Sequence, residues 1–168
     1  MSSEHSSGLL APVTSEEFRR ACGRFPTGVT IASVLDSDGS PHGLTVSSFS
    51  SVSLHPPLVS ICLGHGVKII DLFRASRYFG LNILSVDQEY LSERFARHDG
   101  DRFFEIPWRR GKTGVPLLPS VLANIECEVE QRVTAGDHDI FVAKMVGAEA
   151  VDGEPLIHFT GRYRALAE

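Results

Sequence analysis

Residues 43–59 read Gly43-Leu44-Thr45-Val46-Ser47-Ser48-Phe49-Ser50-Ser51-Val52-Ser53-Leu54-His55-Pro56-Pro57-Leu58-Val59. The stretch begins as a strand, continues as a dense run of hydroxyl side chains, and breaks at two prolines before a short apolar strand, Leu58 to Leu63. Hydroxyl groups and free backbone N–H groups at a strand end can bond the edge of a flat heteroaromatic ring or a phosphate. A serine-rich loop that bonds its own backbone is the competing interpretation.

Two elements are predicted upstream of this stretch. Val29 to Leu35 is rich in β-branched residues, and the turn pair Asp38-Gly39 joins it in a hairpin to the strand from Gly43 to Val46. A helix running to about Arg24 is predicted before this hairpin. The capping box Thr14-Ser15-Glu16-Glu17 opens the helix, and its apolar residues follow at helical spacing: Phe18, Ala21, Cys22 and Phe25.

Downstream of the stretch, short helices alternate with apolar strands. The pattern predicts a helix over 67–73 and a buried strand over 79–84. A second capping box, Ser85-Val86-Asp87-Gln88, predicts a helix that continues through Phe95. The segment 98–118 is rich in charge, glycine and proline, and a loop of this length is typical of a lid or a partner surface.

The C-terminal third is predicted to be β. Residues 123–130 alternate apolar and polar side chains, with the glutamates on the solvent side, and 140–146 return as the second strand of a hairpin. Residues 155–164 form a last strand. Many strands with two or three short helices predict a mainly β fold, a small barrel or sandwich whose closure removes the sheet edges.

Composition excludes several classes of protein. With 168 residues, the chain is expected to form one domain over 14–168 after a flexible arm over 1–13. A net charge of −5 excludes nucleic acid as the main partner. No apolar run approaches the roughly 20 residues that cross a bilayer, and no signal peptide is visible. We therefore expect a cytoplasmic protein that does not associate with a membrane. Cys22, Cys62 and Cys127 are expected to be reduced, buried thiols.

Three further groups of residues are candidates for chemistry. Gly64-His65-Gly66-Val67-Lys68 follows a strand and is expected to open a helix, where N–H groups, the helix dipole and Lys68 favour an anion; a plain turn is the alternative. His138 stands at a hairpin tip, where it could contact a ligand; a turn histidine that is merely exposed is the alternative. The group His98, Asp99, Asp101 and Arg102 has metal-like residue types but reads as solvated charge, so no metal is expected. No GxSxG motif and no nucleophile with a base are visible.

Four segments together resemble the short-chain flavin reductase family. They are Phe25-Pro26-Thr27-Gly28-Val29-Thr30, the stretch 43–59, Gly136-Asp137-His138-Asp139-Ile140-Phe141 and Gly161-Arg162-Tyr163. The resemblance covers nearly everything from Phe18 to Leu166. It implies an FMN-binding split β-barrel, Greek-key-like, and an NAD(P)H:flavin oxidoreductase that passes hydride from NADH or NADPH to FMN or FAD. The reduced flavin would then serve a separate monooxygenase.

The resemblance also implies which residues touch the substrates. Thr45, Val46, Ser47 and Ser48 would line the flavin ring, largely through backbone groups, with Phe49 and Ser51 beside them. Cys62, Leu63, Gly64 and Lys68 would face the ribityl-phosphate arm, and Arg102 and Arg162 are further cofactor-binding candidates. His138 would orient the nicotinamide and is the one residue assigned to catalysis. The chain departs from many members in having His65, Gly66 and Val67 where they carry a serine or threonine for the phosphate.

Family members are generally homodimers with the flavin near the subunit interface, and the resemblance implies the same assembly here. Two alternative functions stay open at this point. One is a flavoprotein that keeps its flavin bound and reduces ferric complexes. The other is a non-enzymatic module that binds flavin or haem. For NADPH, a 2′-phosphate would need a nearby cation, and the sequence offers four without choosing among them: Arg102, Arg109, Arg110 and Lys112.

Overall fold

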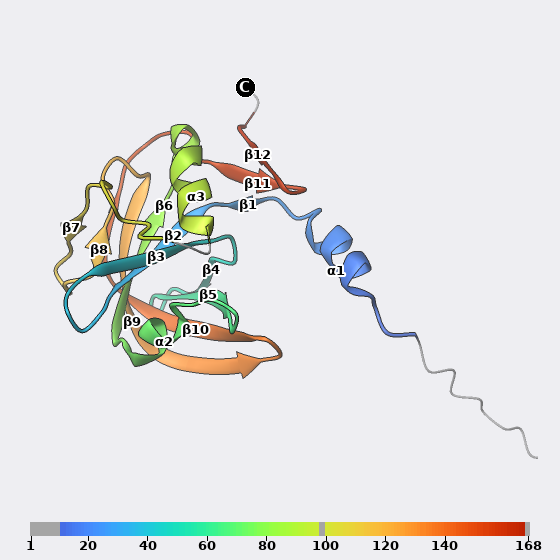
Figure 1. The fold of residues 1–168 in the computed structure, drawn as a ribbon, viewed down its shortest axis with the longest axis horizontal. Coiled ribbons are helices and arrows are strands. Elements are labelled where there is room, and N and C mark those ends of the chain that lie inside the picture. The colour runs from blue at the N-terminus through green and yellow to red at the C-terminus, as the bar shows by residue number, and fades with distance from the viewer. Residues whose placement is uncertain (1–10, 98–99, 167–168) are drawn as a thin grey trace, which may run out of the picture.

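The computed structural model describes residues 11–97 and 100–166. Its main element is a sheet of seven strands in the order β3-β2-β6-β9-β10-β5-β4, every neighbouring pair antiparallel (Figure 1). The mainly β fold with short helices is therefore confirmed. The strands of this sheet are β2 (Thr30–Leu35), β3 (Pro41–Val46), β4 (Ser50–Ser53), β5 (Leu58–Gly64), β6 (Tyr78–Ile83), β9 (Ala123–Ala135) and β10 (His138–Ala150).

Both predicted hairpins are present. β2 pairs with β3 from Thr30↔Val46 to Leu35↔Pro41, and the turn between them contains Gly39 at a positive φ of 79°. β9 pairs with β10 over nearly their whole length, around the turn at Gly136. The β9–β10 hairpin has two register shifts, and such bulges add twist, so one hairpin can bend from the middle of the sheet toward its edge.

The sheet does not close into a barrel among the described residues. It curls until β3 approaches β5, but no ladder joins its two end strands, β3 and β4. The expectation that full closure would remove the sheet edges is wrong, because β3 pairs only with β2 and β4 only with β5 among the described strands, so each end strand keeps one unpaired edge. We call the opening between β3 and the C-terminal end of β5 the seam.

Two apolar clusters hold the molecule together. The first fills the inside of the curled sheet, with Phe73, Phe79 and Phe141 packed edge to face or tilted at 6.1–6.5 Å between ring centres. The second lies between the other face of the sheet and helix α3 (Glu89–Ala96), around Phe95 and Phe103 at 4.9 Å. Both sides of β2 are therefore covered, and five of its six residues are buried.

Two of the three helical segments begin where the sequence predicts. Helix α1 (Ser15–Cys22) starts at the predicted capping box, and the 3-10 turn Val86–Gln88 before α3 starts at the second one. Helix α2 (Ile70–Ala75) begins three residues later than predicted, because residues 67–70 first form a turn in which Ile70 N–H donates to Val67 O. Lys68 therefore precedes the helix, and the predicted contribution of a helix dipole at this point is wrong.

Helix α1 stands away from the sheet (Figure 1), and none of its residues is buried. No other part of the described chain covers its apolar face, and Phe18 on this face is 63% exposed. Cys22 belongs to this face and is exposed, so the expectation of three buried thiols is wrong for Cys22. Cys62 is half-buried and Cys127 is buried, and all three are free.

The 98–118 segment, expected to be a lid or a partner surface, is packed against the sheet where it is described. Residues 100–118 include the paired strands β7 (Arg109–Arg110) and β8 (Pro116–Leu117), and they bury Phe103, Leu117 and Leu118. Glu126 of β9 holds this segment by accepting from the N–H groups of Lys112 (3.0 Å) and Thr113 (2.6 Å). His98 and Asp99, part of the metal-like group, lie outside the described residues.

Glu126 is only 6% exposed, so its predicted solvent-facing position is wrong. Burial raises the pKa of Glu126, but the hydrogen bonds from Thr113 and Lys112 outweigh burial and bring the pKa below its usual value. Burial, with the nearby Glu126 charge, raises the pKa of Cys127 to about 12 and keeps this thiol protonated.

The C-terminal segment differs from its prediction. Instead of one strand over 155–164 it forms a hairpin of β11 (Ile157–Phe159) and β12 (Arg162–Arg164), because Thr160 and Gly161 both take positive φ values and reverse the chain. β11 also pairs with β1 (Thr27–Gly28), so these three short strands form a second, small sheet. In the described part of the chain, no helix combines the length and the apolar character that a membrane span needs.

Candidate functional site

The loop that links β3 to β4 is the first component of the candidate site. Ser47, Ser48 and Phe49 have backbone N–H groups with no hydrogen-bond partner among the described residues. Ser48 fixes the loop, because its Oγ accepts from Cys62 N–H (2.8 Å) and donates to Cys62 O (3.1 Å). A backbone N–H group needs a hydrogen-bond partner, so these three groups are available to a ligand at the seam, and the Ser48–Cys62 hydrogen bonds fix the loop that carries them.

The C-terminal end of β5 forms the opposite side of the seam. Cys62 holds Ser48, and Gly64, two residues or about 7 Å further along the strand, pairs with His138 of β10. A Cβ atom on Gly64 would come 3.4 Å from His138 Nε2, so the absence of a side chain lets the imidazole lie against the strand. His138 is half exposed, and its Nδ1 bonds Asp137 Oδ1 at 2.7 Å. This hydrogen bond lowers the pKa of Asp137.

A pocket of about 170 Å³ brings Lys68 and Arg102 together. Arg102 donates one hydrogen bond to Gly43 O at 2.6 Å and another to Arg97 O, which fixes the guanidinium beside β3. Burial lowers the pKa of Arg102, although a guanidinium stays charged in proteins. The other residues of the pocket are Pro41, His42, Gly43, Ile69, Gly100, Asp101 and Phe103. The two cations make it suitable for an anionic group.

A second pocket, of about 190 Å³, lies further along β3. Thr45 and Ser47 line it, and since residues two apart share one face of a strand, they stand on the same side of β3 as Gly43. Thr45 Oγ1 donates to Ser92 O (2.6 Å), and Ser92 Oγ bonds Tyr163 OH (2.7 Å). The pocket also includes Val29, Ala96 and His158. From Gly43 to Ser47, one side of β3 thus spans about 13 Å between a cationic and a hydroxyl-lined pocket.

Other predicted residues lie where their side chains cannot line either pocket. Val46 and Leu63 are 4% and 1% exposed and point into the first apolar cluster. Any ligand contact they make comes from the backbone. Ser51 is exposed on β4, and Arg162 is exposed on β12 next to Tyr163, which does line a pocket.

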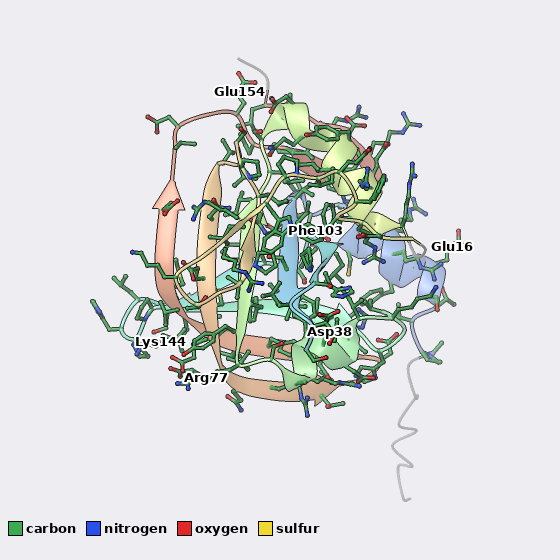
Figure 2. All side chains as sticks on the ribbon, turned by 60° about the vertical axis from the view of Figure 1, so that its left-hand side comes forward. Glu16, Asp38, Arg77, Phe103, Lys144 and Glu154 are labelled. Atoms are coloured by element: carbon green, nitrogen blue, oxygen red, sulfur yellow. The ribbon has the colours of Figure 1, made fainter. Side chains whose placement is uncertain are left out.

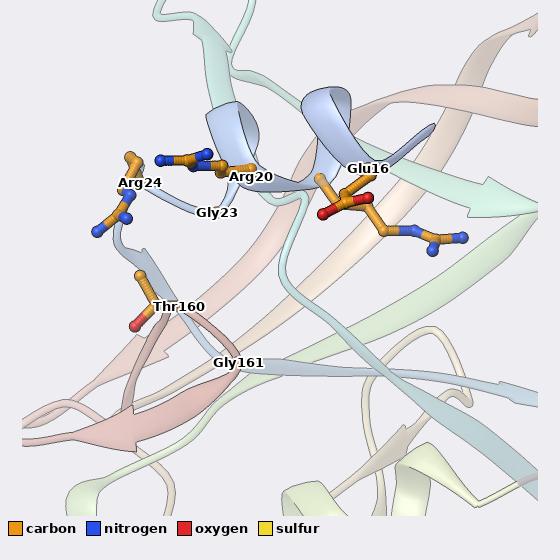
Figure 3. Close-up of a pocket in the computed structure, with 7 residues that line it drawn as sticks. Glu16, Arg20, Gly23, Arg24, Thr160 and Gly161 are labelled. Atoms are coloured by element: carbon orange, nitrogen blue, oxygen red, sulfur yellow. The ribbon is translucent and has the colours of Figure 1, made fainter. Parts of the chain in front are cut away.

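A larger pocket, of about 650 Å³, is elsewhere. Figure 3 shows it between α1 and the turn at Thr160 and Gly161, and its lining also includes Glu16, Arg19, Arg20 and Arg24. The only backbone hydrogen bond between this turn and the α1 end, among the described residues, is Thr160 N–H to Gly23 O at 3.2 Å. It is a space under an unpacked helix, and none of the predicted site residues lines it.

The residues at the seam fit a flavin. Free N–H groups at Ser47–Phe49 suit the carbonyl and nitrogen acceptors on the edge of the ring system, and Lys68 with Arg102 suits a phosphate. The glycine at position 64 brings the His138 imidazole against β5, so an aromatic ring borders this side of the seam. An elongated ligand with a polar-edged head and an anionic tail matches this arrangement.

Sequence reasoning missed several residues of the two pockets. They are His42, Ser92 and His158, which come from three separate elements. His42 could have been found from its position next to Gly43 on a half-solvated strand. Ser92 and His158 reach the site only because α3 and β11 pack beside β3, which is tertiary information.

A family model described as "Flavin reductase like domain" matches residues 22–167. Among curated proteins, the chain is 40% identical over 149 residues to the FMN reductase (NADH) SmoA of Agrobacterium fabrum, covering 89% of this chain and 84% of that protein. It is 37% identical over 155 residues to the reductase component of a 4-nitrophenol 4-monooxygenase/4-nitrocatechol 2-monooxygenase of Rhodococcus opacus, covering 92% and 83%.

Among solved structures, the chain is similar to the NADH:FAD oxidoreductase SgcE6 of Streptomyces globisporus in complex with NAD and FAD fragments. The TM-score is 0.88 at 36% sequence identity, and the match covers 95% of this chain and 96% of the other. Similarity therefore extends over almost the whole described fold.

Proposed function

The chain belongs to the flavin reductase-like domain family, and on that premise we propose that its flavin lies along β3, with the ring at the Ser47–Phe49 loop and the phosphate at Lys68 and Arg102. The protein is an oxidoreductase that transfers hydride from NADH to FMN or FAD and supplies the reduced flavin to a partner monooxygenase. The observation that carries the proposed placement is the set of three free N–H groups at the seam.

The side chains have modest tasks in this reaction. When both substrates are bound, the nicotinamide supplies the hydride and the flavin ring accepts it. The Ser47–Phe49 loop binds the edge of the ring with fixed N–H donors, which favour the negative charge that reduction places there. His138, against Gly64 at the other side of the seam, orients the nicotinamide without exchanging a proton. Lys68 and Arg102 neutralise the phosphate.

We expect NADH oxidation by the purified chain to require added FMN or FAD and to saturate with it, as measured by the absorbance of NADH. His138→Ala should raise the KM for NADH about tenfold, the loss of one good contact, and change the KM for FMN by less than about twofold. His55→Ala is the matched control, an exposed histidine at the opposite end of β5. An unchanged KM for NADH in His138→Ala would remove this residue from the site.

We also propose that the protein is a homodimer and that α1 is the arm that docks on the partner. The support is physical: Val13, Phe18 and Phe25 are 72%, 63% and 76% exposed, and an amphipathic helix is stable only when its apolar face is covered. A second copy of the chain offers the same face by symmetry.

Light scattering after size exclusion should give a mass of twice 18.4 kDa. Phe18→Lys should shift the population toward the monomer, since it puts a charge in the covered face, while Glu16→Lys on the polar side of the helix should not. A monomeric wild-type protein at micromolar concentration would refute the proposed assembly.

The cytoplasm is the compartment we propose. The support is the three free cysteines, one of them exposed, because thiols in an oxidising compartment tend to pair.

A further inference from the structure

A buried carboxylate lies next to the candidate site, and the proposed reaction does not use it. Asp139 follows His138 on β10, and its side chain is 1% exposed. Oδ1 accepts hydrogen bonds from His65 Nε2 (2.9 Å) and Thr134 Oγ1 (3.0 Å), and Oδ2 accepts one from Arg74 Nε (2.8 Å). Arg132 Nε lies at 3.9 Å.

These partners keep Asp139 ionised. The hydrogen bond from Arg74, followed by that from His65, lowers the pKa of Asp139 far below its usual value. Because the carboxylate only accepts, His65 must carry a proton on Nε2. Removing the negative charge of Asp139 would leave the donors that His65, Thr134 and Arg74 direct at it without an acceptor. Such a change is expected to cost folding free energy.

The contacts connect two segments that carry substrate-binding residues. Residues 65 and 74 both bond Asp139, so the stretch between them, which includes Lys68, is fastened to one carboxylate at both ends. His65 N–H also donates to Asp137 O (2.8 Å), which fixes the turn to the tip of the hairpin.

The second segment is the hairpin itself. Successive side chains of a strand point to opposite faces, so holding Asp139 on the inner face sets the rotation of β10 at His138 on the outer face. His138 is exposed at this position and Asp139 is buried, as the alternation requires.

We propose that Asp139 is a positioning residue that couples the flavin side of the site to the nicotinamide side, acting through His65 and Arg74 on Lys68 and through β10 on His138. This inference rests on the proposed function. It predicts that one substitution at a residue that touches neither substrate weakens the binding of both. A displacement of about 1 Å in such contacts can change rates up to a hundredfold, so a moderate loosening has a measurable effect.

Asp139→Asn tests the proposal, because the amide keeps the volume but presents a donor to the donors around it. We expect the KM values for NADH and for FMN each to rise about fivefold, with kcat per folded molecule changed less. The matched control is Asp71→Asn. Asp71 bonds the same Arg74 at 3.0 Å, but its side chain is 84% exposed, and neither KM should change.

Double variants separate coupling from general weakening. In a His138→Ala background, Asp139→Asn should raise the KM for NADH by less than about twofold, and in a Lys68→Ala background it should do the same for FMN, because the residue through which it acts is gone. Full fivefold increases in both backgrounds would overturn the proposal. So would a lower Tm with both KM values unchanged, since that is the signature of a purely structural role.

The single variants also keep this test distinct from the test of function. If His138→Ala and Lys68→Ala leave both KM values unchanged, the proposed placement of the substrates fails before Asp139 is considered. If Asp139→Asn does not fold, Arg74→Gln decides by the same criteria, because Arg74 is one-third exposed and its loss removes one donor from Oδ2.

Discussion

Lys68→Glu is expected to raise the KM for FMN about a hundredfold and to leave the KM for riboflavin, which lacks the phosphate, nearly unchanged. Lys68 lines the 170 Å³ pocket beside Arg102, and it is the more exposed of the two cations. A charge-assisted contact contributes about 1.5–3 kcal/mol, and reversing the charge adds repulsion to its loss. Steady-state NADH oxidation with each flavin in turn measures both values.

Lys144→Glu is the control for the change in net charge. Lys144 lies on β10, six residues or about 20 Å along the strand from His138, and Figure 2 shows it projecting outward at the periphery. Its substitution should leave both KM values within about twofold of wild type. If Lys68→Glu weakened FMN and riboflavin equally, Lys68 would not contact the phosphate, and the flavin would have to be placed differently in the seam.

Gly80→Ala is expected to destabilise the fold by about 3 kcal/mol, the upper part of the range for overpacked interiors. Gly80 lies in the middle of β6, and a Cβ atom there would come 2.6 Å from Ser33 Oγ and 2.8 Å from Pro116 O. Those two atoms form a buried hydrogen bond of 2.5 Å, so the methyl group would have to separate β2 from β8. Urea unfolding should show a lower midpoint with an unchanged slope.

Gly28→Ala is the matched control for that experiment. A Cβ atom on Gly28 would have no neighbour within 4 Å, so the free energy of unfolding should change by less than about 0.5 kcal/mol. Equal midpoints for the two variants would mean that β8 can move away from the sheet at no cost, against the packing described around Leu117.

Local patterns predicted most of the fold. The two capping boxes and the turn pairs gave helix starts and hairpins correctly, because each depends on residues within a few positions of one another. Burial was predicted less well where it depends on distant segments. Glu126 alternates like a solvent-facing residue, yet the 111–113 segment, which no periodicity places, covers it and bonds it. Phe18 shows the reverse case, because it is an apolar residue that no other described segment of the chain buries.

The candidate site was predictable only in part for the same reason. Residues 45–49 stand out in the sequence, and the structure gives the loop free N–H groups. The sequence could not reveal that Ser48 clamps Cys62, or that Val46 and Leu63 point inward, because both follow from how far the sheet curls. Asp139 looked like part of a turn motif, and its role emerges only when α2 and β9 surround it.

The unclosed seam has a consequence for how this scaffold tolerates change. In the proposed placement of the flavin, ligand recognition at the seam would fall to main-chain groups of the Ser47–Phe49 loop, and every residue except proline supplies the same N–H group. With that placement, side chains that face outward from the loop could be replaced without loss of the proposed flavin contacts, as long as Ser48 keeps its hydrogen bonds to Cys62. The surface beside the proposed flavin site would then be able to change to suit a different partner oxygenase while flavin binding is retained.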